Sequence, residues 1–130
     1  MKRQISLAVF AAAMAVSGAA FAQDFVQSGA ADHLPQKEGK DIYNAICSAC
    51  HMPEGQGAVG AGHYPALANS DFVESPDAVM AWVVNGYKGM PPLGGVLDDA
   101  QVAAVVNYVR HNLGNNYEGE TTAEEVAAIR

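Results

Sequence analysis

Apolar residues of this 130-residue chain recur every three to four positions in separate segments, which is the spacing of an amphipathic helix. The first stripe consists of Gly39, Ile42, Tyr43 and Ile46. It predicts a helix that buries these residues. A glycine on the buried face of a helix costs stability unless another element must approach closely. Gly39 therefore predicts a close contact between two helices.

A second stripe lies nearer the C-terminus and consists of Val102, Val105, Val106, Val109 and Leu113. Valine favours strands on propensity alone, but the period here is helical. Asp98 with Gln101 three residues later has the form of a capping box, and Gly114 marks the predicted end. We therefore predict a helix that carries Tyr108 on its flank, where the ring can pack across Gly39.

A middle helix is predicted from its ends. Ser75 is a good N-cap, Pro76 suits the first helical position, and the Asn85-Gly86 pair suits the end. Its expected apolar face contains Val79, Trp82 and Val83.

A last short helix is predicted over residues 123–129, because Thr121 and Glu124 have the spacing of a capping box. Together these segments favour an all-α fold.

The N-terminus has the organisation of a secretory signal peptide. Lys2 and Arg3 precede an apolar stretch at 5–16 that is too short to span a bilayer, and residues 20–22 form a small-x-small cleavage signal. We expect residues 1–22 to be removed by cleavage after Ala22 and the mature chain to be exported to the periplasm. No second apolar run reaches membrane-spanning length, so we expect no membrane span in the mature chain.

Cleavage makes the chain strongly acidic. Without Lys2 and Arg3, five basic residues remain against 14 acidic ones, which gives a formal charge of −9. This charge argues against nucleic acid or an anionic membrane as partner. The remaining 108 of 130 residues suit a single domain at 23–130, with an N-terminal arm at 23–35 and a C-terminal extension at 115–130.

The segment Cys47-Ser48-Ala49-Cys50-His51 has the spacing required for covalent attachment of a c-type haem. Two residues between the cysteines let one helical turn present both sulfurs to the two vinyl groups of the porphyrin. His51 can then offer a ring nitrogen to the iron as proximal ligand.

Other sites can also contain a Cys-x-x-Cys pair, namely a thioredoxin-like redox pair, half of a zinc site or a structural disulfide. A redox pair favours a βαβ pattern, and a zinc site needs two further ligands nearby. Neither pattern is found, since His33, His63 and His111 are scattered singly. A disulfide would also persist in the periplasm, so compartment alone does not decide.

The ligand on the other face of the iron decides the class of function, because iron bound on both faces transfers electrons whereas an open face binds small molecules. Three methionines remain after cleavage. Met52 adjoins His51, and Met80 lies inside the middle helix, where packing is its expected role. Met90 stands in the loop 86–92 between a glycine and a proline, which present its thioether in a stiffened loop. We predict Met90 as the second axial ligand.

From Gly39 to Leu113 the chain resembles the class I c-type cytochromes, which are small single-haem electron carriers. The resemblance rests on the haem motif, the Gly-Met-Pro loop and the flanking helices. It implies the all-α class I cytochrome c fold, with a haem-binding core at 36–114 and one haem c attached through Cys47 and Cys50. It also implies that the carbonyl of Pro65, in Tyr64-Pro65-Ala66-Leu67, accepts a hydrogen bond from His51.

Two segments, 64–69 and 122–130, are similar to cytochrome subunits that accept electrons from periplasmic dehydrogenases. The resemblance implies an electron carrier that is not itself an enzyme. Its donor is expected to be a periplasmic dehydrogenase, and its acceptor a downstream cytochrome or oxidase of the respiratory chain. Two alternatives stay open: a haem protein with an open or labile sixth site that binds small molecules, as a sensor or enzyme, and a haem-free thiol-disulfide protein.

The chain lacks the lysine-rich surface of the mitochondrial members of this family, so their docking mode does not transfer. With so acidic a chain we expect a donor with a basic surface. The expected docking patch is apolar and consists of Ala58, Val59, Met90, Pro91 and Pro92.

Overall fold

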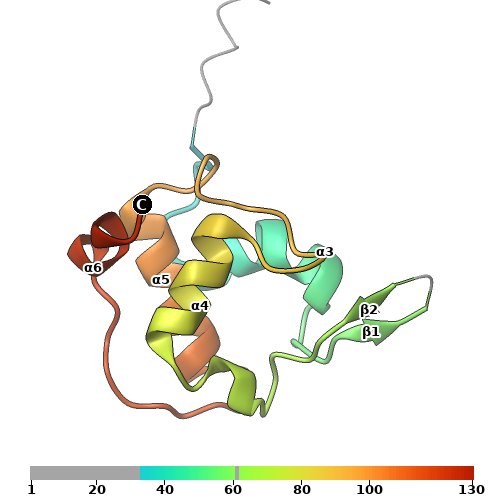
Figure 1. Cartoon of the computed structure of the whole chain (residues 1–130). Coiled ribbons are helices and arrows are strands. Elements are labelled where there is room, and N and C mark those ends of the chain that lie inside the picture. Colours follow the sequence, from blue (N-terminus) through green and yellow to red (C-terminus); the bar gives the residue numbers. More distant parts are fainter. Residues whose placement is uncertain (1–32, 61) are drawn as a thin grey trace, which may run out of the picture. The chain divides into compact units, whose positions relative to one another are not determined.

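The structure is a computed structural model that describes residues 33–60 and 62–130. The expected signal peptide and residues 23–32 of the expected arm lie outside the described residues. In chain order the elements are α2 (Gly39–Ile42), η1 (Tyr43–Cys47), α3 (Ser48–His51), β1 (Ala58–Val59), β2 (His63–Tyr64), η2 (Asp71–Val73), α4 (Pro76–Asn85), α5 (Asp99–His111) and α6 (Ala123–Ala128) (Figure 1). The described part is mainly helical, which confirms the predicted fold class. Within it, no helix is both long enough and apolar enough to cross a bilayer.

The first predicted helix consists of three consecutive pieces, α2, η1 and α3, that follow one another without a break. The middle piece, η1, is a wide π-helical turn from Tyr43 to Cys47. The predicted apolar stripe is buried as expected, because Ile42 and Tyr43 are fully inaccessible and Ile46 is half-buried.

The close contact predicted at Gly39 is confirmed. A Cβ added to Gly39 would overlap the carbonyl oxygen of Ala104 and lie 2.8 Å from the Cβ of Tyr108. The rings of Tyr43 and Tyr108 pack against each other at a tilt of 48°, with their centroids 5.4 Å apart. The lack of a side chain at Gly39 therefore lets α2 lie directly against the backbone of α5.

The capping box predicted for α5 is confirmed. The Asp98 carboxylate accepts from the Gln101 backbone N–H at 2.8 Å, and the Gln101 side chain accepts from the Asp98 N–H at 2.9 Å. The predicted end is wrong, because the helix stops at His111 rather than running to Gly114. Leu113 and Gly114 both have left-handed backbones, with φ of 57° and 80°. They form a turn in which the Leu113 carbonyl accepts a hydrogen bond at 3.1 Å from the backbone N–H of Asn69.

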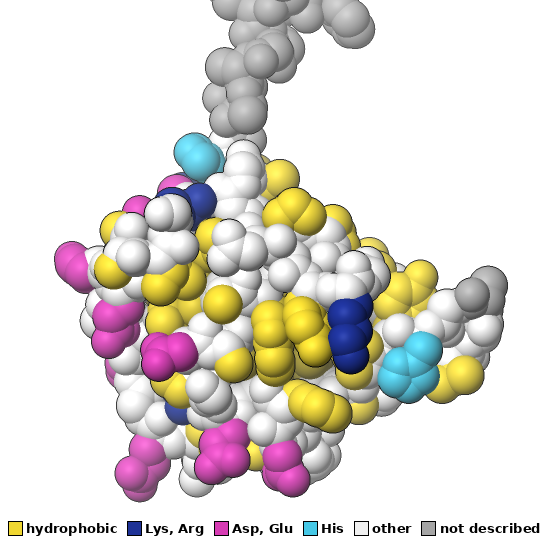
Figure 2. All heavy atoms as spheres, viewed as in Figure 1, with side chains coloured by type: hydrophobic (Ala, Val, Ile, Leu, Met, Phe, Trp, Pro, Cys, Tyr) yellow, Lys and Arg dark blue, Asp and Glu magenta, His cyan; other side chains and the backbone are white. Residues whose placement is uncertain are grey.

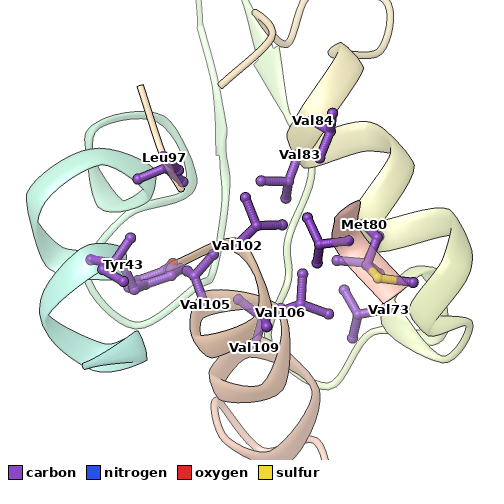
Figure 3. Close-up of a cluster of buried hydrophobic side chains, with 14 residues drawn as sticks. Tyr43, Val73, Met80, Val83, Val84, Leu97, Val102, Val105, Val106 and Val109 are labelled. Carbon is purple, nitrogen blue, oxygen red and sulfur yellow. The ribbon is translucent and has the colours of Figure 1, made fainter. Parts of the chain in front are cut away.

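The core lies on both sides of α5. Figure 3 shows the valines of α5 between Tyr43 on one side and Val73 and Met80 on the other. Met80 is only 2% exposed, which confirms the packing role predicted for it. In α4 the predicted start is also confirmed, because Ser75 caps the Ala78 N–H. Trp82 is only half-buried and stacks on Tyr87 at 5.3 Å.

The C-terminal segment packs onto α5 through α6, where Val126 is fully buried. The cap of α6 was predicted one residue too early, because Thr122 and Glu125 form the capping box. Thr121 is engaged elsewhere: its N–H and its carbonyl bind the two ends of the Asn107 amide at 2.8 and 2.9 Å.

The cap of α5 should contribute stability that depends on pH. The hydrogen bond from the Gln101 N–H, with help from Lys37, lowers the pKa of Asp98 below its usual 3.8. Replacing Asp98 with alanine should lower the free energy of unfolding at neutral pH by about 1 kcal/mol. A lowered folded pKa means that this contribution is present above the usual pKa and is lost as pH falls through the folded one.

Urea unfolding of the haem-loaded protein at several pH values would measure this. The difference in the free energy of unfolding between the wild-type protein and Asp98→Ala should become smaller as the pH falls. Asp98→Asn keeps a capping oxygen but does not titrate, so its difference from Asp98→Ala should stay constant. A pH-independent loss in Asp98→Ala would show that the charge does not matter.

Candidate functional site

The two cysteines are presented by the helical segment that follows the buried stripe. Cys47 closes η1 and Cys50 lies in α3, and both side chains are half-buried. Burial is the main reason why the pKa of Cys47 rises to about 11. A thioredoxin-like redox pair needs the opposite, a lowered thiol pKa. The environment of Cys47 therefore argues against that alternative.

His51 is held in one orientation by the loop that follows it. Its imidazole is 9% exposed, and Nδ1 lies 2.9 Å from the carbonyl oxygen of Pro65. A carbonyl oxygen only accepts, so Nδ1 carries the hydrogen and Nε2 keeps its lone pair. The residue that the resemblance pointed to thus lies in contact with His51, and the free lone pair is the kind that binds a metal.

Two glycines bring this loop back to His51. Gly57 donates its N–H to the His51 carbonyl at 3.0 Å, and Gly55 accepts from the Leu67 N–H at 2.7 Å. Gly57 has φ of +67°, and a Cβ there would lie only 2.8 Å from the carbonyl carbon of Pro65. The sequence analysis missed both glycines. The signal that could have found them is the Gly-x-Gly spacing shortly after the haem motif.

The hairpin of β1 and β2 lies between Gly57 and Pro65 in the chain. It pairs Ala58 with Tyr64 and Val59 with His63 in antiparallel register. Strands of two residues are too short to show alternation in a sequence, so no pattern predicted them.

Met90 is presented by a tight turn after α4. Tyr87 and Met90 exchange backbone hydrogen bonds of 3.0 and 2.9 Å. Gly86 and Lys88 both adopt left-handed backbones, with φ of 76° and 51°. Met90 is half-buried, so its thioether is neither enclosed in the core, as that of Met80 is, nor free in solvent.

The structure thus joins Cys47, Cys50, His51 and Pro65 in one continuous site. Met90 comes from a separate loop, and it packs against the same apolar cluster as Cys47. The remaining histidines are not part of this site. His33 and His63 are exposed, and Nε2 of His111 lies 3.0 Å from the carbonyl oxygen of Gly119. Two cysteines separated by two residues and followed by an oriented imidazole form a donor set that fits a covalently bound haem.

A helical fold with this donor set defines the class of c-type cytochromes. Comparison with known families supports this: the sequence model described as "Cytochrome C oxidase, cbb3-type, subunit III" matches residues 35–109. The chain belongs to this family of cytochrome c domains. It is a class I electron-carrying cytochrome whose cofactor is haem c.

Two small cytochromes are similar over most of their length. Cytochrome c-555 of Chlorobaculum tepidum is 36% identical over 115 residues, which cover 84% of this chain and 95% of that protein. Cytochrome c6 of a Synechococcus species is 35% identical over 83 residues, which cover 63% of this chain and 74% of that protein.

A larger relative is the gluconate 2-dehydrogenase cytochrome c subunit of Pantoea cypripedii. It is 32% identical over 107 residues, which cover 71% of this chain but only 24% of that subunit. The chain therefore spans about a quarter of the length of this relative.

Proposed function

We propose that the mature chain, residues 23–130, is a periplasmic carrier that takes single electrons from a dehydrogenase and passes them to a downstream cytochrome or oxidase of the respiratory chain. In this proposal Cys47 and Cys50 would hold the haem, and His51 and Met90 would bind its iron. The observation that carries it is the hydrogen bond from His51 Nδ1 to the Pro65 carbonyl, which leaves Nε2 able to bind iron. The similarity to a dehydrogenase cytochrome subunit supports this type of donor.

Haem c supplies an iron that changes its charge by one electron. The residues of the chain determine the reduction potential of the iron and how much the protein rearranges when the iron changes charge. The Pro65 carbonyl fixes the direction of the His51 imidazole, so little reorganisation of this residue accompanies the change. A methionine as the other ligand favours the ferrous state and raises the potential, which suits an acceptor of electrons from a dehydrogenase.

The surface exposes apolar side chains that suit short-lived docking. Of the expected docking patch, Val59 is 84% exposed, Pro91 and Pro92 are exposed, and Ala58 and Met90 are half-buried. Figure 2 shows hydrophobic side chains gathered beside a basic one, whereas the acidic side chains on this face lie along its left and lower edges. The acidic groups therefore attract a basic donor from a distance, while apolar contacts make the final complex.

The proposed docking predicts a salt-dependent rate of reduction. Stopped-flow reduction by the native donor, identified among proteins that co-purify with the cytochrome, should slow by about tenfold or more as ionic strength rises to physiological values. Val59→Asn leaves the charge unchanged, so it should lower the rate at every salt concentration and keep the slope. A rate that climbs steadily with ionic strength would mean that the two surfaces repel and that the donor surface is not basic.

A further inference from the structure

The residue after His51 has a backbone conformation that a side chain disfavours. Met52 has φ of 68° and ψ of 157°, in a region that is essentially reserved for glycine. Such a conformation costs about 1–3 kcal/mol and persists only where the surroundings hold it. The chain must turn here, because Gly57 donates its N–H back to the His51 carbonyl at 3.0 Å.

One buried side chain holds this turn in place. The Tyr43 hydroxyl donates to the Met52 carbonyl at 2.7 Å, and the Gly55 N–H donates to the same oxygen at 3.0 Å. Tyr43 is fully buried, and its ring is fixed against Tyr108. Phenylalanine would fill the same space in the core, so packing alone does not require the hydroxyl.

We propose that Tyr43 is a positioning residue for His51. Its hydroxyl holds the Met52 carbonyl, stabilises the strained turn, and so fixes the start of the loop whose Pro65 carbonyl orients the imidazole. This inference rests on the proposed role of His51 as an iron ligand. Two hydrogen bonds would then position His51. One joins its imidazole to the Pro65 carbonyl, and the other joins the Tyr43 hydroxyl to the backbone carbonyl of Met52.

The test is Tyr43→Phe in the haem-loaded protein, which removes only the hydroxyl. Amide hydrogen exchange should accelerate about tenfold at Gly55 and Gly57, since losing one buried hydrogen bond frees the turn that both N–H groups close. The proton resonances of the His51 ring, which the iron shifts, should move, and the midpoint potential should change. A residue that only packs in the core would alter neither the ring resonances nor the potential.

Tyr108→Phe is the matched control. It removes a hydroxyl from the other ring of the same pair, and that hydroxyl forms no hydrogen bond with any of the described residues. Its exchange rates, resonances and potential should stay at wild-type values. If Tyr43→Phe behaves like Tyr108→Phe, the proposal is wrong.

A second variant tests the strained turn itself. Glycine adopts the backbone angles of Met52 without a steric cost, so adding Met52→Gly to Tyr43→Phe should slow exchange again at Gly55 and Gly57. Exchange as fast as in Tyr43→Phe alone would refute the role of backbone strain. The proposed function fails separately, if the wild-type spectrum shows no histidine bound to the iron.

Discussion

Replacing Met90 with alanine is expected to open one face of the iron. The variant should bind carbon monoxide in its ferrous state, and its midpoint potential should fall by more than about 0.1 V, within the roughly 0.8 V range that axial ligands span. The reason is that the tight turn between Tyr87 and Met90 presents a half-buried thioether in a hydrogen-bonded loop. Met52 is also half-buried, but it directly follows His51 in the chain. Optical titration with carbon monoxide and a potentiometric titration measure the two effects.

Met80→Ala is the control for this experiment. Met80 lies in the core at 2% exposure, so its truncation should cost about 2–5 kcal/mol of stability and leave the iron closed. If Met80→Ala opened the iron and Met90→Ala did not, the ligand assignment would be reversed. Ready binding of carbon monoxide by the wild-type protein would instead favour the sensor or enzyme with an open sixth site.

A single methyl group at Gly39 is expected to destabilise the protein by about 2–3 kcal/mol. Alanine is the better helix former by about 1 kcal/mol, which opposes this loss. The clash prevails because the added Cβ meets the backbone carbonyl of Ala104, which cannot move unless α5 moves with it. Guanidinium unfolding of the haem-loaded Gly39→Ala protein would show a lower midpoint.

Gly95→Ala is the matched control, since a Cβ there meets nothing within 4 Å and the backbone is not left-handed. We expect it to be neutral or to stabilise by less than about 1 kcal/mol. Equal stability of Gly39→Ala and the wild-type protein would show that α2 and α5 can separate at no cost.

The helices and the contact between α2 and α5 could be predicted from the sequence, because each of them corresponds to a local sequence pattern. Helical spacing marked the buried stripe at Ile42 and Tyr43, and the glycine in that stripe marked the approach of α5. The capping box at Asp98 fixed the start of α5 to the residue. For the site, the Cys-x-x-Cys-His spacing predicted Cys47, Cys50 and His51, whereas Pro65 was predicted only from the resemblance to the family.

The features that could not be predicted depend on contacts between distant residues. The end of α5 is set where the Asn69 backbone binds the Leu113 carbonyl, and no local pattern reports such a contact. The cap of α6 lies one residue later than predicted, and the Thr121 backbone is bound by the side chain of Asn107, 14 residues away in the chain. The left-handed backbone of Met52 is likewise invisible in the sequence, since methionine gives no sign of it.

The wide turn η1 changes which way the haem motif points. A regular helix advances by about 100° per residue, so one residue accommodated in a π-helical turn rotates everything after it by that angle relative to the stripe before it. In a regular helix Cys50 and His51, which follow Ile42 by about two turns, would lie about 80° and 180° around the axis from it, and the π-helical turn shifts both by about 100°. The angle between the buried stripe and the haem motif is therefore set by the π-helical turn between Tyr43 and Cys47 and not by the spacing of the residues alone.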